Sequence, residues 1–227
     1  GHVLKELEGG EWRLLQNRFT PYSFHQMIIP RSCWSVQELR TLGGVERIET
    51  ALSCIEEEVD KHVVKKLFVT VHIGAIAGQN VGHLHYHIVE YMPDDITPSS
   101  APEEMRRFFH ENPNLVLLGM GMFVVGIAGL RAGQCFIVPK REKSGFLLPA
   151  SLIYDVIDLY NRKFKSTQGL PPDFSIALQF QDSEFQYGVY TPVLNHWGAA
   201  EHMALYETGC PLTLPWPHEL TAEYLKS

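Results

Sequence analysis

Three histidines alternate with apolar residues near the middle of the chain, in the segment GHLHYHIV at 82–89. On a strand, residues two apart point to the same face, so His83, His85 and His87 would form a row of imidazoles spaced about 6 to 7 Å apart. A single buried histidine is usually structural, but three on one face are hard to explain by packing alone. Imidazole has a reference pKa of about 6.5 and is mostly neutral at cellular pH, so it can attack a substrate without an extra base. The row therefore predicts a face directed at a cleft or a ligand.

The surrounding segment GQNVGHLHYHIV at 78–89 resembles the histidine triad signature, His-φ-His-φ-His-φ-φ, with its Gly-Gln four to five residues upstream. A second segment, YSFHQMIIPR at 22–31, resembles the upstream His-x-φ-φ-φ-Pro element of the same superfamily. Both elements stand in the family's order and spacing. The resemblance implies an enzyme that acts at a nucleotide α-phosphate through a covalent nucleotidyl-histidine intermediate.

The resemblance also implies a role for each matching histidine. His85 matches the middle histidine and would be the nucleophile. His83 would help to fix the tautomer of His85, in part through its backbone carbonyl. His87 would contact the phosphate and assist the leaving group, and His25 would support the triad from behind.

Substrate contacts are expected from the residues before the triad. Gln79 matches the glutamine that hydrogen-bonds the phosphoryl group or the scissile oxygen. The glycine-rich loop 74–82 could bring backbone N–H groups against a phosphate. His72 stands where the phosphoramidase-like members carry asparagine, so contacts to the ribose or phosphate are expected to differ there. The expected substrate-binding residues are thus Gln79, Asn80, His72 and Gly78.

Hydrophobic periodicity predicts an α+β fold built twice. Strands are expected at 11–17, 24–30, 66–73 and 82–91, with a helix from Val45 to Val59. After the proline-rich stretch 93–103 and a short helix, strands at 114–127, 134–139, 175–181 and near 202–206 surround a helix at about 152–164. We expect two tandem histidine-triad-like repeats, each an antiparallel sheet with a helix, that form a pseudo-dimer within one chain. The predicted parts are a catalytic repeat at 1–92, a linker and short helix at 93–109, and a degenerate repeat with a C-terminal tail at 110–227.

The register of the two expected copies can be set at Pro30 and Pro139, which pairs His25 with Gln134. Matching HIVEY at 87–91 to HMALY at 202–206 pairs His85 with Ala200. The second copy would then lack the middle histidine, and only the N-terminal half would be catalytic.

Composition limits the classes of partner. The net charge of -7 leaves no basic surface for nucleic acid, so the expected substrate is small, and the resemblance implies that it is a nucleotide. No signal peptide and no run of 18 apolar residues is present, which favours a cytoplasmic protein without membrane contact. The four cysteines form no Cys-x-x-Cys pair, so neither a structural zinc nor another cofactor is expected. A monomer is expected, because the pseudo-dimer would already pair the two copies.

Two alternatives stay open. His-x-His on a strand is also how cupins present metal ligands, and Glu90 lies nearby, but a metal site leaves Gln79 and the His25 strand unexplained. A catalytically silent nucleotide-binding protein is the second alternative. Uridylyltransferase and dinucleoside-polyphosphate phosphorylase relatives also carry two copies but usually have glutamine at the position of His87. Hydrolysis and transfer therefore both stay open, as do a nucleotide sugar, a dinucleoside polyphosphate and a nucleoside phosphoramidate as substrates.

Overall fold

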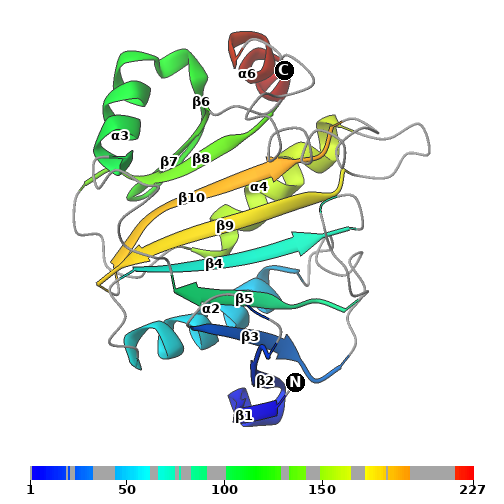
Figure 1. Ribbon diagram of the computed structural model, residues 1–227. Coiled ribbons are helices and arrows are strands. Elements are labelled where there is room, and N and C mark those ends of the chain that lie inside the picture. Colours follow the sequence, from blue (N-terminus) through cyan, green and yellow to red (C-terminus); the bar gives the residue numbers. More distant parts are fainter. Residues whose placement is uncertain are drawn as a thin grey trace.

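An antiparallel sheet of ten strands dominates the computed structural model (Figure 1). The structure describes residues 2–18, 20, 24–32, 44–61, 66–74, 77, 83–90, 101–128, 133–141, 149–164, 172–182, 184–194 and 218–227. The strands of the first half are β1 (His2–Leu7), β2 (Trp12–Gln16), β3 (His25–Pro30), β4 (Lys66–Ile73) and β5 (Tyr86–Glu90). Those of the second half are β6 (Val116–Met120), β7 (Phe123–Ile127), β8 (Cys135–Pro139), β9 (Phe174–Gln181) and β10 (Glu184–Pro192). The helices are α2 (Gly44–Lys61), α3 (Ala101–Glu111), α4 (Ala150–Lys163) and α6 (His218–Lys226), with 3₁₀ turns η1 (Glu8–Gly10) and η2 (Pro113–Leu115). This large sheet with its helices confirms the predicted α+β class.

The strand order has the same form when it is read from either edge of the sheet. From one edge it is β1-β2-β3-β5-β4, and from the other it is β6-β7-β8-β10-β9. The two series meet where β4 pairs antiparallel with β9, from Lys66 opposite Gln181 to Ile73 opposite Phe174. One long helix follows the third strand of each series, α2 after β3 and α4 after β8. The two halves of the chain therefore place their elements in the same order.

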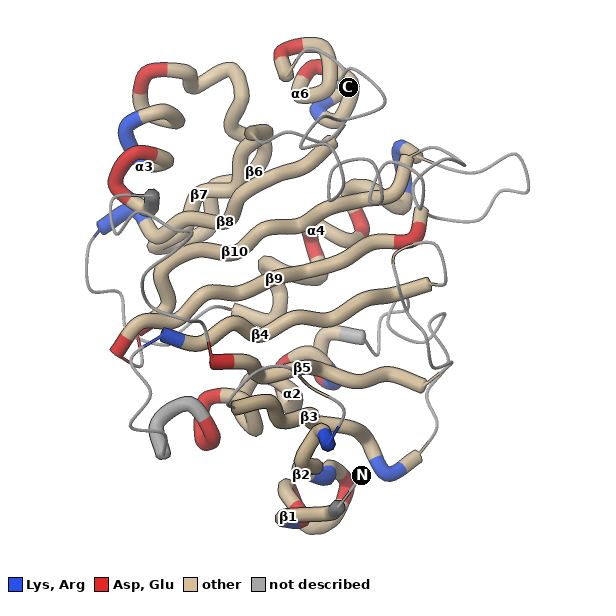
Figure 2. The backbone as a smooth tube through the Cα atoms, in the orientation of Figure 1, with Lys and Arg blue, Asp and Glu red and all other residues tan. Residues whose placement is uncertain are grey.

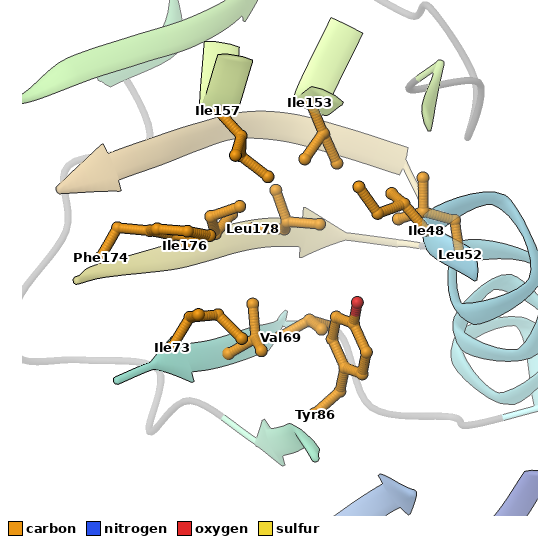
Figure 3. Close-up of a pocket in the computed structure, with 11 residues that line it drawn as sticks. Ile48, Leu52, Val69, Ile73, Tyr86, Ile153, Ile157, Phe174, Ile176 and Leu178 are labelled. Carbon is orange, nitrogen blue, oxygen red and sulfur yellow. The ribbon is translucent and has the colours of Figure 1, made fainter. Parts of the chain in front are cut away.

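One face of the sheet is buried under α2 and α4, which lie behind it in the view of Figure 1. Alternate residues of β4, from Leu67 to Ile73, are buried against apolar side chains of both helices. Burying each such side chain contributes about 1.5 to 3 kcal/mol. Figure 3 shows a small void in this layer, lined by both helices and the sheet, with a volume of about 20 Å³ and apolar side chains around it. Since it has room for about one water molecule, this layer is a packed core.

The opposite face carries the remaining residues of β4, which include Phe68, Thr70 and His72, and we call it the histidine face. In the second half α3 packs on this face, because Val138 of β8 contacts Phe109 of α3 while its neighbour Ile137 lies in the core. The fit is close: a Cβ at Gly126 would collide with the Phe109 ring. Part of the histidine face is thus covered by α3, beside β7 and β8.

Charged side chains avoid the middle of the sheet, as Figure 2 shows. The strands β4, β5, β9 and β10 carry them only at their ends, at Lys66, Glu90 and Glu184. No helix among the described residues is long and apolar enough to cross a membrane.

The structure corrects several of the expected elements. The expected strand at 114–127 is a hairpin of β6 and β7, which turns at Gly121 and Met122. β1 and α6 were not expected, and β5 begins only at Tyr86. The strand that lies between β8 and β9 is β10, whereas 202–206 lies outside the described residues. The expected strand near 202–206 therefore stays a prediction.

Candidate active site

β5 and the segment that leads into it position the predicted triad. Tyr86 and Ile88 are buried on the core side, so His87 between them points to the histidine face. His83 and His85 precede the strand, and only 9% of the His85 surface is exposed. The rings of His85 and His87 meet edge to face, with centroids 4.7 Å apart and planes inclined by 81°. Two of the three predicted imidazoles are therefore in direct contact.

The backbone fixes the orientation of the His85 ring. Its Nδ1 lies 2.8 Å from the carbonyl oxygen of His83. A carbonyl oxygen can only accept a hydrogen bond, so Nδ1 must carry the hydrogen. In the neutral ring the lone pair then belongs to Nε2, the nitrogen turned away from this contact. The predicted role of the His83 carbonyl has the geometry it needs.

His25 reaches the triad from the neighbouring strand. β3 pairs with β5 so that His25 lies opposite Val89 and Met27 opposite His87. The Nε2 atom of His25 lies 2.8 Å from Nδ1 of His87, and the two ring centroids are 5.0 Å apart. This strand pairing brings together residues that are 62 positions apart in the sequence.

Two polar residues that the motifs do not single out hold the other side of His25. The Oγ1 atom of Thr20 lies 2.8 Å from His25 Nδ1. The Asn17 side-chain nitrogen lies 3.2 Å from Nδ1 and 3.3 Å from Nε2 of the same ring. The backbone N–H of Asn17 also donates to the His25 carbonyl. The only sequence signal for them was the turn that joins the two strands.

Burial keeps the imidazoles of His25 and His87 uncharged, and neighbouring imidazoles add to this effect at His87. Desolvation, followed by the nearby His85, His25 and His72, lowers the pKa of His87 to about 4. Desolvation also lowers the pKa of His25. At cellular pH both rings are therefore neutral, and each can hold one proton on either nitrogen.

His72 adds a further imidazole from β4. Desolvation is the main cause that lowers its pKa, a hydrogen bond with the Ala77 backbone opposes this, and His85 is close enough to lower it further. Its Nδ1 atom is buried and has no hydrogen-bond partner among the described residues. A buried polar atom in that state is suited to a bond from a ligand. The structure thus places His72 near His85 and His87, and its role in substrate binding stays a prediction.

The other predicted substrate contacts, Gly78, Gln79 and Asn80, lie outside the described residues and stay predictions. The start of their loop is described at Gly74, whose φ is +96°. A Cβ at this position would collide with the carboxylate of Asp173, at the start of β9. The second half of the chain therefore holds the start of the predicted phosphate-binding loop.

The described residues lend the metal alternative no support, because among them no group of three or more His, Cys, Asp or Glu side chains could hold a metal ion. His196 and His202, in the C-terminal part of the chain, lie outside the described residues.

The second half presents different residues at the corresponding sheet positions. Ile28 lies opposite Tyr86 in the first half, and Ile137 lies opposite Gly188 in the second. If Pro30 is matched to Pro139, Tyr187 takes the position of His85 and Val189 that of His87. The expected match of His85 with Ala200 stays a prediction, because Ala200 and the segment HMALY lie outside the described residues.

Comparison with known proteins supports the resemblance at the level of the fold. No family model and no curated protein matches the sequence. Among solved structures, a GalT-like protein from Arabidopsis thaliana superposes with a TM-score of 0.61 and 17% identity, over 95% of this chain and 83% of that one. An ADP-glucose phosphorylase from Arabidopsis thaliana with bound ADP-glucose superposes with a TM-score of 0.61 and 16% identity, over 95% of this chain and 82% of that one. A uridylyltransferase superposes with a TM-score of 0.61 and 15% identity, over 95% of this chain and 84% of that one. The predicted resemblance is thus confirmed for the fold, which this chain shares with these three proteins.

Proposed function

We propose that this chain, which has the fold of the uridylyltransferase-like proteins, transfers a nucleotidyl group through a covalent adduct on His85. The observation that carries the proposal is the 2.8 Å contact between His85 Nδ1 and the His83 carbonyl. It places the hydrogen on Nδ1 and leaves Nε2 with the lone pair that a nucleophile needs.

The reaction proceeds in two displacements. In the first, His85 Nε2 attacks the α-phosphorus, a nitrogen–phosphorus bond forms, and the bond from phosphorus to the leaving group breaks. His87 supplies a proton to the leaving group through its Nε2. In the second, water or an acceptor phosphate attacks the phosphorus of the adduct, and the bond from phosphorus to His85 breaks. An attacking group that carries a proton gives it to His87. The edge-to-face contact of the two rings supports these roles, because it brings His87 beside His85.

A small nucleotide suits the surroundings of these rings. Within the described part of the chain, the strands around them carry charged residues only at their ends, so these strands offer no basic patch to attract an anionic substrate. Imidazoles and backbone N–H groups of the 74–82 loop would hold the phosphates instead. One structural neighbour holds ADP-glucose. We therefore rank a nucleotide sugar first, followed by a dinucleoside polyphosphate and a nucleoside phosphoramidate.

We further propose that the chain consists of two tandem repeats in the arrangement of a dimer, with 1–92 catalytic and 110–227 degenerate. The support is the equal strand order of the two halves and the antiparallel pairing of β4 with β9 between them. The second repeat has Tyr187 and Val189 where the first has its catalytic imidazoles. Its part in the reaction is to hold the sheet and the loop that starts at Gly74.

The test is a panel of the three substrate classes, each with and without inorganic phosphate or a sugar phosphate. Rapid quench should trap a phosphorus–histidine adduct in the wild type and none in His85→Ala. His110→Ala, which changes an exposed histidine on α3, is the matched control and should keep full turnover. Turnover without an acceptor assigns a hydrolase, and strict dependence on an acceptor assigns a transferase or phosphorylase. Nucleotide binding without any turnover would overturn the proposal in favour of a silent binding protein.

A further inference from the structure

A continuous chain of hydrogen bonds runs from Thr20 through His25 to His87. Thr20 Oγ1 lies 2.8 Å from His25 Nδ1, and His25 Nε2 lies 2.8 Å from His87 Nδ1. Both distances are short for a hydrogen bond. Both nitrogens of His25 thus have a hydrogen-bond partner in this series. Within the series of Thr20, His25 and His87, Nε2 of His87 is the nitrogen that can contact a substrate.

The hydrogen atoms in the contacts of Thr20, His25 and His87 can be arranged in two ways. In the first arrangement the Thr20 hydroxyl donates to His25 Nδ1, His25 Nε2–H donates to His87 Nδ1, and His87 carries its hydrogen on Nε2. In the second, His87 Nδ1–H donates to His25 Nε2, His25 Nδ1–H donates to Thr20, and His87 Nε2 has the lone pair. A hydroxyl serves both arrangements because it can donate and accept.

We infer that Thr20 is a positioning residue whose hydroxyl allows this chain to change between the two arrangements, so that His87 gives and then takes a proton at Nε2 while it stays neutral. The inference rests on the proposed function of His85 and His87. It assigns to Thr20 a part in both displacements although Thr20 need not touch the substrate.

Protons balance over the cycle. When His87 gives its Nε2 hydrogen to the leaving group, the Nε2 hydrogen of His25 moves to His87 Nδ1. The Thr20 hydroxyl hydrogen moves to His25 Nδ1, and a solvent water gives Thr20 a proton in its place and leaves as hydroxide, since Thr20 is half-buried and within reach of solvent. In the second displacement the attacking water gives a proton to His87 Nε2, and each transfer runs in reverse.

The lowered pKa of His87 explains why a proton relay would help it to act as an acid. Burial and three neighbouring imidazoles lower the pKa of His87 to about 4, so an imidazolium is a poor species at this site. A lone neutral imidazole is a weak acid. If a second proton arrives at Nδ1 as the first leaves from Nε2, His87 can act as an acid without ever carrying a charge.

Asn17 provides a contrast within the same contact. Its side-chain nitrogen is almost equally far, 3.2 and 3.3 Å, from the two nitrogens of His25. A partner that lies along one lone pair would be much closer to that nitrogen than to the other. Asn17 therefore holds the ring in place but does not select where its proton lies.

The experiment compares Thr20→Val, Thr20→Ser and Asn17→Ala with the wild type. Valine keeps the shape of threonine but lacks the hydroxyl, and serine keeps the hydroxyl. With a poor leaving group, Thr20→Val should lower kcat by roughly 10- to 100-fold with little change in KM. With an activated aryl phosphate leaving group, kcat should change by less than about 3-fold, because such a group needs no proton. Thr20→Ser should restore kcat, and Asn17→Ala should lack the dependence on the leaving group.

A spectroscopic measurement keeps the inference separate from the proposed function. The ¹⁵N chemical shifts of the His25 and His87 rings report which nitrogen carries hydrogen, with no substrate present. Thr20→Val should shift them toward a different tautomer population, and Thr20→Ser should return them to the wild-type values. Unchanged ring shifts and equal loss with both leaving groups in a folded Thr20→Val protein would overturn the relay. Changed shifts in a protein that turns over no substrate would instead overturn the proposed function alone.

Discussion

The Nδ1 atom of His85 lies 2.8 Å from the carbonyl oxygen of His83, two residues earlier in the chain. The acceptor belongs to the backbone, so the orientation of the proposed nucleophile depends on the path of the chain before β5. The side chain of His83 is not part of this contact. Substitutions can therefore separate the roles of the two residues.

His85→Ala should lower turnover by roughly four or more orders of magnitude, because loss of an activated nucleophile commonly has an effect of that size. Nucleotide binding should persist, since His72 and His87 are retained. His83→Ala keeps the carbonyl that orients His85 and should lower kcat by less than about 10-fold. Single-turnover kinetics and equilibrium binding of a nucleotide measure both. Equal losses in the two variants would contradict the backbone assignment.

His87→Gln should affect the reaction in proportion to the need of the leaving group for a proton. We expect a loss of about 100-fold or more with a sugar phosphate or alkyl leaving group and a much smaller loss with an activated aryl group. The measurement is the slope of log kcat against the pKa of the leaving group, which should steepen in the variant. An unchanged slope would mean that His87 gives no proton.

Stability should fall in mild acid because of the same residue. The native pKa of His87 is about 4, whereas an unfolded histidine titrates near 6.5. Between these values the unfolded chain binds more protons than the native one, so the free energy of unfolding should decrease as the pH falls from about 6.5 to 4. The lowered pKa values of His25 and His72 act in the same direction.

Urea denaturation at several pH values tests this prediction. The His87→Gln variant should show a shallower decrease than the wild type over the same window, because one of the contributing groups is gone. A constant difference in unfolding free energy between the two proteins from pH 7.5 to 4 would contradict it.

Gly74→Ala should destabilise the protein and lower its activity. The backbone at Gly74 has a φ of +96°, and a Cβ there would collide with the Asp173 carboxylate. Strain of this kind costs on the order of 1 to 3 kcal/mol. Gly119→Ala is the control, because a Cβ at that exposed strand position meets nothing within 4 Å.

The measurements are the melting temperature and the turnover of Gly74→Ala and Gly119→Ala. The double variant Gly74→Ala/Asp173→Ala is measured in the same way. The double variant should recover part of the stability, since removal of the carboxylate relieves the collision but not the strained backbone. No recovery would show that the contact with Asp173 is not what constrains this loop.

Local sequence was sufficient to predict the cluster of histidines in the first half. Alternation of His83, His85 and His87 with apolar residues and the spacing to His25 depend on strand periodicity, which is a local property. The α+β class and the resemblance to a superfamily followed from the same short segments. The β1 strand was missed because its alternation is weak, and β5 was predicted to start too early because the alternation of histidine with apolar residues already begins at His83.

Tertiary structure alone decided how distant segments meet. The pairing of β3 with β5 places His25 on His87, and the turn before β3 then brings Thr20 and Asn17 to the same ring. The pairing of β10 with β8 and β9 gives β10 the place in the second half of the sheet that β5 has in the first. Strand pairing is a long-range choice that depends on burying one whole face of the sheet, so no short likeness within the chain could fix it. The same long-range packing sets Asp173 against Gly74, since the two residues begin to interact only once β4 and β9 have joined the two halves.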